Sequence, residues 1–128
     1  MKLKNWLIAG TILCSISSSA QDSRKIDFVE YDLPNGLHVI LHEDHSTPIA
    51  AVTILYHVGS KNENVGRTGF AHFFEHLMFE GTTNIERHTY DKYVEGAGGT
   101  LNANTSQDRT FYYELLPSNQ LELGLWLE

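Results

Sequence analysis

The segment His-Phe-Phe-Glu-His at residues 72–76 constrains the local structure of this chain more than any other. In an α-helix, residues four positions apart lie on one face, about 6 Å apart along the axis. The side chains of His72 and His76 could then reach a single metal ion, with the carboxylate of Glu75 beside it. The spacing therefore predicts a helix that carries a candidate metal site.

The residues around this segment predict that the helix is amphipathic. On a helical wheel at about 100° per residue, four apolar side chains lie within about 60° of the direction of Phe70. These are Phe70, Phe73, Phe74 and Leu77. His72, Glu75 and His76 fall on the opposite side. We expect the apolar side to pack against the protein and the polar side to carry the chemistry.

The pattern H-x-x-E-H is the inverted form of the H-E-x-x-H motif of zinc peptidases. In such a site the glutamate can take a proton from a water molecule bound to the metal. The alternative is an ordinary solvated helix face. The chain has seven histidines among 128 residues, and a chance match to the pattern has a probability of a few per cent. The segment alone leaves both interpretations open.

The N-terminus has the features of a signal peptide. Lys2 and Lys4 precede a short apolar run at residues 6–16, and small residues up to Ala20 offer a cleavage point. The run is too short to span a bilayer, which argues against a stable membrane anchor. We expect a signal peptide at residues 1–20, a mature chain at residues 21–128, and a periplasmic or secreted protein.

Cleavage after Ala20 would remove Cys14, the single cysteine. A metal site in the mature chain must then use histidine and carboxylate ligands. Loss of the two lysines before Ala20 leaves seven basic against 16 acidic residues. This acidic balance argues against nucleic-acid binding, which needs a basic surface.

The order of apolar patterns and turn residues predicts an α+β fold with a largely antiparallel sheet and helices packed on it. The expected strands are residues 27–32, 37–42, 49–58, 100–105 and 110–116, and the expected helices are residues 69–79 and 88–95. Strand 49–58 is apolar enough to be largely buried. A further helix begins near Ser118 and is still in its pattern at Glu128. We therefore expect the sequence to be the N-terminal portion of a longer domain.

Other histidines do not suggest a second metal site. His38 and His42 alternate on one predicted strand, and His45 follows. Strand residues four positions apart are separated by about 13 Å, too far to share an ion. We expect these side chains to be exposed, and we assign no role to His57 or His88.

Three segments form longer patterns. Residues 69–82 read GFAHFFEHLMFEGT, residues 98–105 read GGTLNANT with TFYY following at 110–113, and residues 31–37 read YDLPNGL. In this order they resemble the active-site helix, the glycine turn with its strand, and the opening strands of the pitrilysin family. That family includes insulin-degrading enzyme and the mitochondrial processing peptidases. The resemblance runs from about residue 28 to the end.

The resemblance implies a zinc endopeptidase that cleaves peptides or unfolded polypeptide segments. His72 and His76 would be zinc ligands and Glu75 the general base. The strand around Asn102 and Ala103 would be the edge to which substrate adds as an extra strand, held mainly by main-chain hydrogen bonds. A homo- or hetero-oligomer with a family subunit is compatible with the resemblance.

The family's third zinc ligand is a glutamate on a later helix, which the resemblance places beyond residue 128. Glu80 is a poor substitute, because eight residues of helix separate it from His72 by about 12 Å. The remaining candidates cannot be distinguished by sequence position: Glu95, Glu114, Glu122 and Glu128. We therefore expect these 128 residues alone to bind zinc weakly and to have little or no peptidase activity.

Two other interpretations compete with the peptidase. The chain could be a non-catalytic subunit of the same family that binds peptides or a partner. A structural zinc protein is a weaker alternative, since structural sites have four protein ligands, commonly including cysteine.

Overall fold

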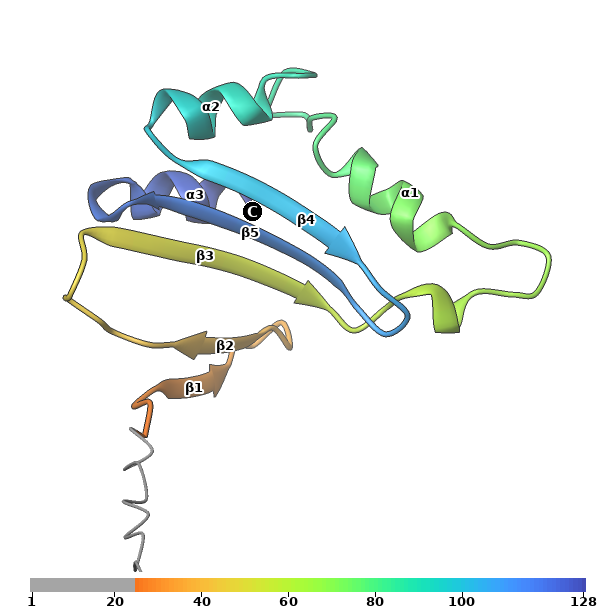
Figure 1. The fold of residues 1–128 in the computed structure, drawn as a ribbon, viewed down its shortest axis with the longest axis horizontal. Coiled ribbons are helices and arrows are strands. Elements are labelled where there is room, and N and C mark those ends of the chain that lie inside the picture. The colour runs from red at the N-terminus through yellow and green to blue at the C-terminus, as the bar shows by residue number, and fades with distance from the viewer. Residues whose placement is uncertain (1–24) are drawn as a thin grey trace, which may run out of the picture. The chain divides into compact units, whose positions relative to one another are not determined.

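The computed structural model of the chain describes residues 25–128 (Figure 1). The predicted signal peptide at residues 1–20, with Cys14, lies outside the described residues. The chain divides into two compact units, with the boundary in the sequence between Glu43 and Asp44. Between residues 25 and 128, no helix is long and apolar enough to cross a membrane.

The described part of the first unit is an antiparallel hairpin of β1 (Val29–Asp32) and β2 (His38–Leu41). Gly36 has a φ of +87°, which a glycine adopts without strain, and its amide donates to the carbonyl of Leu33 at 2.8 Å. The predicted hairpin is confirmed. His38 and His42 are exposed, as expected, and their rings contact different partners, Asp32 and the carbonyl of Asp27.

The second unit contains an antiparallel sheet in the order β3-β5-β4: β3 (Ile49–Tyr56), β5 (Thr110–Pro117) and β4 (Thr100–Thr105). The central strand β5 pairs with a neighbour on both sides. Its alternate residues are buried: Thr110, Tyr112, Glu114 and Leu116. The α+β class with antiparallel pairing is therefore confirmed.

Three helices accompany this sheet: α1 (Phe70–Leu77), α2 (Tyr90–Gly96) and α3 (Leu121–Leu127). Short 3₁₀ turns at Ser60–Asn62 and Ser118–Gln120 complete the order of elements. The predicted helix at 88–95 begins later, at Tyr90. His88 has a φ of +62°, which is left-handed backbone and cannot belong to a right-handed helix.

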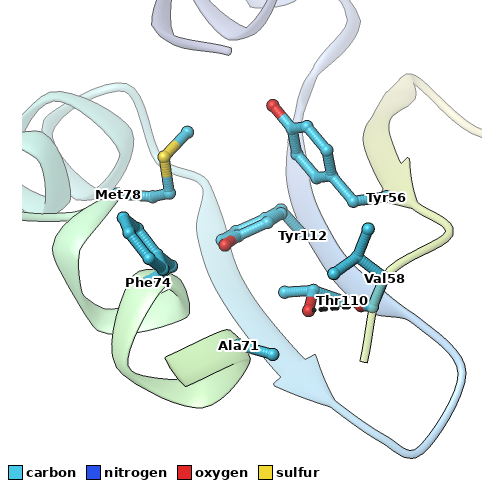
Figure 2. Close-up of a pocket in the computed structure, with 7 residues that line it drawn as sticks. All are labelled: Tyr56, Val58, Ala71, Phe74, Met78, Thr110 and Tyr112. Carbon is cyan, nitrogen blue, oxygen red and sulfur yellow. Dashed lines mark hydrogen bonds between the residues drawn. The ribbon is translucent and has the colours of Figure 1, made fainter. Parts of the chain in front are cut away.

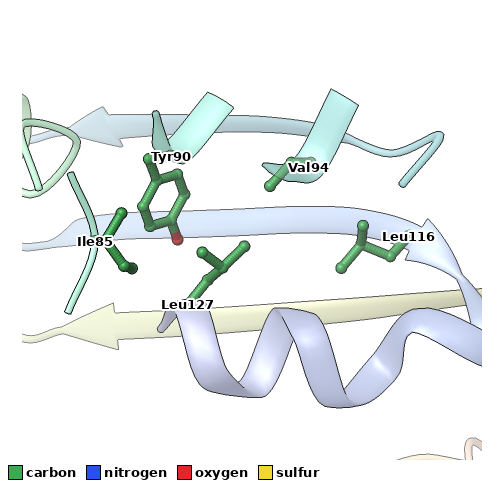
Figure 3. Packing of buried hydrophobic residues seen from close by; sticks show 5 residues of the cluster. All are labelled: Ile85, Tyr90, Val94, Leu116 and Leu127. Atoms are coloured by element: carbon green, nitrogen blue, oxygen red, sulfur yellow. The ribbon is translucent and has the colours of Figure 1, made fainter. Parts of the chain in front are cut away.

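The hydrophobic core lies where α2 and α3 meet the sheet (Figure 3). Its buried members are Ile85, Tyr90, Val94, Leu116 and Leu127. Gly124 brings α3 close to the sheet, because a Cβ there would lie within 3 Å of both Leu116 and Val52. The expectation of a largely buried strand 49–58 was wrong. Only Val52 is buried in β3, because side chains alternate and the helices cover one face.

A carboxylate is buried beside this core. Glu114 is 1% exposed, and the hydroxyl of Tyr90 donates a hydrogen bond of 2.5 Å to its Oε1 atom. Its Oε2 atom has no hydrogen-bond partner among the described residues. Burial raises the pKa of Glu114 above its ordinary value of 4.5. Ionisation of Glu114 therefore costs folding free energy.

Replacing Glu114 with glutamine should stabilise the protein at pH 8. A raised folded pKa means that stability is complete below the unfolded pKa and is lost as the pH rises through the folded value. Glutamine cannot ionise, and its carbonyl oxygen can still accept from Tyr90. We expect the free energy of unfolding to rise by ~1 kcal/mol at pH 8, with a smaller change at pH 4.

Urea denaturation of both proteins at the two pH values would measure this difference. Glu95→Gln, at an exposed position on α2, is the matched control and should change little at either pH. A Glu114→Gln variant that is less stable than the wild type at pH 8 would contradict the prediction.

Candidate functional site

The N-terminus of α1 is held by a glutamate from the preceding loop. The carboxylate of Glu63 accepts hydrogen bonds from the backbone amides of Gly69 at 2.7 Å and Ala71 at 2.8 Å. These are among the amides that lack partners inside a helix, and a negative charge there also favours the helix dipole. The bonds from Ala71, then Gly69 and Phe70, lower the pKa of Glu63. Glu63 thus fixes where α1 begins.

Sequence reasoning did not identify Glu63. The available signal was Gly69, which has a φ of +97° and no side chain that could accept a hydrogen bond from the first amides. The cap had to come from another part of the chain, and sequence spacing does not reveal which residue supplies it.

The two histidine rings meet on α1. The Nε2 atoms of His72 and His76 lie 3.1 Å apart, and both side chains are exposed. Two nitrogens that bind one tetrahedral zinc ion at 2.0–2.1 Å lie roughly 3.3 Å apart. The observed spacing and the neutral imidazole donors therefore fit a shared zinc ion. The predicted helix is confirmed, and the ligand roles stay predictions.

Glu75 is the only buried residue of α1, at 9% exposure. Its Oε2 atom accepts a hydrogen bond from the hydroxyl of Thr105 at the end of β4. The side of the helix that carries the motif is thus the side held against the sheet. The carboxylate has a fixed position next to the histidine pair.

The expectation that the apolar side of α1 packs was wrong. Phe73 and Phe74 are 56% and 58% exposed, whereas Glu75 is buried. The polar contacts lie elsewhere on the helix, where Glu63 accepts from the first amides and Thr105 donates to Glu75. The apolar side instead borders a cavity of about 280 Å³ (Figure 2). That cavity is lined by Tyr56, Val58, Ala71, Phe74, Met78, Thr110 and Tyr112.

A cavity of about 550 Å³ lies beside the motif. It is lined by Ser60, His72, Glu75, Ala103, Asn104, Thr105, Ser106 and Gln107. The structure therefore brings Ala103 to the same cavity as Glu75. Asn102 is exposed and is not among the lining residues; its side-chain oxygen accepts from the amide of Ala103 at 2.8 Å. Substrate binding by Asn102 and Ala103 stays a prediction.

No set of three or more metal-binding side chains occurs between residues 25 and 128. Glu80 accepts a hydrogen bond of 2.6 Å from Arg87, and this bond is the main cause of its lowered pKa. Glu114 is buried beside the core and Glu95 is exposed on α2. The third ligand beyond residue 128 stays a prediction.

Comparison with known proteins identifies relatives of this chain. The family model for insulinase (peptidase family M16) matches residues 38–125. The chain is 41% identical over 97 residues to the zinc protease PqqE of Helicobacter pylori, a match that covers 75% of this chain and 21% of that protein. It is 39% identical over 102 residues to the mitochondrial-processing peptidase subunit beta of Saccharomyces cerevisiae, covering 80% and 21%.

The fold also has a solved relative. A protease from Helicobacter pylori superposes with a TM-score of 0.77 at 38% identity, covering 79% of this chain and 24% of that chain. The chain spans about a fifth of the length of the curated relatives named above.

Replacing Glu63 with glutamine should weaken the start of α1. Glutamine has one acceptor oxygen where the carboxylate uses two, and it lacks the charge that favours the helix dipole. The lowered pKa of Glu63 means that its contribution is complete above the unfolded value of 4.5 and is lost as the pH falls through the folded value. We expect Tm to fall by a few degrees at pH 7 and by less at pH 3.

Thermal unfolding followed by circular dichroism would measure both values. Glu95→Gln is again the matched control. Equal losses of Tm at pH 7 and pH 3 would show that the charge of Glu63 has no such role.

Proposed function

Because the chain belongs to the insulinase family of peptidases (peptidase family M16), we propose that it carries the catalytic motif of a zinc-dependent endopeptidase. The observation that supports this most directly is the pair of Nε2 atoms 3.1 Å apart, next to the buried carboxylate of Glu75. The substrates would be peptides or unfolded polypeptide segments. His72 and His76 would be zinc ligands, and Glu75 the general base.

A zinc ion at this position would supply a Lewis acid for the scissile carbonyl and lower the pKa of a bound water towards 7. The residues of the chain do the remaining work. His72 and His76 present neutral nitrogens from one helix face. Glu75 accepts the proton of the attacking water and returns it to the leaving amine.

The substrate would lie along β4. This strand is at an edge of the sheet in the second unit, and Ala103 lines the cavity that contains Glu75. An extended peptide that pairs with an edge strand is held by main-chain hydrogen bonds, which require little of its sequence. Asn102, the neighbour of Ala103, would assist through its exposed side chain. This geometry supports an endopeptidase of broad sequence preference.

Two further parts of the proposal concern the larger protein. A catalytic zinc site normally has three protein ligands, and we place the third, a glutamate, on a helix outside these 128 residues. One relative is by name the beta subunit of the mitochondrial-processing peptidase, which supports assembly with a family subunit.

We also propose export from the cytoplasm, supported by the basic start and short apolar run of residues 1–20. The mature protein should begin at Gln21. Mass spectrometry of the protein isolated from its own cells would measure this, and an intact N-terminus at Met1 would contradict it.

The role of Glu75 is tested by Glu75→Gln in the protein expressed from its complete open reading frame. Loss of a general base typically reduces turnover by 10²–10⁴-fold, so we expect kcat to fall by about that factor. Zinc content, measured by elemental analysis, should stay that of the wild type because both histidines remain. Glu95→Gln should cleave the same fluorogenic peptide at the wild-type rate. Unchanged cleavage by Glu75→Gln would exclude the proposed role.

The 128 residues alone should behave differently. With two ligands in place of three, we expect weak zinc binding and little or no peptide cleavage. Full cleavage by this chain, abolished by Glu75→Gln, would show that it needs no third ligand from elsewhere.

A further inference from the structure

The two oxygens of the Glu75 carboxylate have different surroundings. Oε2 accepts the hydrogen bond from Thr105. Oε1 makes no hydrogen bond within residues 25–128, and the side chain borders the cavity that also contains His72. One oxygen is therefore held by the protein, and the other is available to a water molecule or a substrate.

The alternation of side chains along β4 places Thr105 on the face from which it can reach Glu75. Leu101, Ala103 and Thr105 are half-buried, while the residues between them are exposed. The half-buried face is the one on which the Thr105 hydroxyl reaches Glu75. Because Thr105 pairs directly with Thr110 of the central strand β5, its backbone position is fixed by the sheet.

The direction of the hydrogen bonds made by Thr105 and Thr110 follows from the number of hydroxyl protons. Each threonine hydroxyl has one proton to donate. Thr110 donates its proton to the carbonyl of Val58 at 3.0 Å (Figure 2). The hydroxyl oxygens of Thr105 and Thr110 are 3.5 Å apart, which is long for a hydrogen bond between hydroxyl groups. The proton of Thr105 therefore goes to Glu75.

We propose that Thr105 is a positioning residue for the general base. It holds Oε2, so that the proton leaving the attacking water binds Oε1, while Thr105 keeps its own proton throughout. This inference rests on the proposed function of Glu75 and adds which oxygen acts and what orients it. A carboxylate free to rotate would spend part of its time with neither oxygen directed at the water, and such misplacement can cost up to about 100-fold in rate.

The test compares three variants of the protein expressed from its complete open reading frame. Thr105→Val keeps the shape and removes the hydroxyl, whereas Thr105→Ser keeps the hydroxyl and removes the methyl group. Thr53→Val is the matched control, because Thr53 is an exposed threonine on β3, the edge strand on the other side of β5 from β4. Each protein is assayed for kcat and KM on one fluorogenic peptide and for zinc content.

A second measurement does not depend on activity. Tm is measured on the metal-free proteins for Thr105→Val, Glu75→Ala and the double variant. If the hydroxyl acts through Glu75, Thr105→Val lowers Tm by a few degrees when Glu75 is present and by little when residue 75 is alanine.

The proposal expects Thr105→Val to lower kcat 10- to 100-fold at unchanged KM and zinc content. Most of the loss should be recovered in Thr105→Ser, and none should be seen in Thr53→Val. Wild-type kcat in Thr105→Val, or additive Tm changes in the double variant, would overturn it while the Glu75→Gln result still supports the peptidase. Wild-type cleavage by Glu75→Gln would overturn both proposals.

Discussion

Two carboxylates with hydrogen bonds to fixed partners determine how α1 lies on the sheet. Glu63 holds the first amides of the helix, and Glu75 is held one turn further on by Thr105 of β4. Together they turn the motif side of the helix towards the strand edge. The proximity of the histidine pair, the base and the edge strand in one region depends on this orientation. Hydrophobic packing alone would favour the opposite side of α1.

The face of β5 that the helices cover changes from polar to apolar side chains along the strand. It begins with Thr110, whose hydroxyl contacts that of Thr105, and ends with Leu116 in the core between α2 and α3. Glu114 lies between these ends as a buried carboxylate with one unpartnered oxygen. The groups that hold the site and the groups that stabilise the core thus occupy different ends of one strand.

The sequence predicted the features that depend on local spacing. Alternation and turn residues predicted the order of strands and helices and the first hairpin. The i to i+4 spacing predicted the helix that carries the motif. Three short patterns predicted the family. The burial of Glu75 could not be predicted in this way, because apolar periodicity does not show that Thr105, 30 residues away, donates a hydrogen bond to it. The exposure of β3 was missed for a related reason, since an apolar run does not reveal that helices cover only one face.

The exposed histidine pair on α1 has a practical consequence for isolating this protein. Two imidazoles at i and i+4 on an accessible helix also bind Ni²⁺ and Cu²⁺, and copper binds nitrogen ligands more tightly than zinc does. An untagged chain should therefore be retained on a nickel or copper affinity resin. The metal found in a purified sample could then come from the column or the buffers and not from the cell. Removing all metal with a chelator and adding back a known metal avoids this.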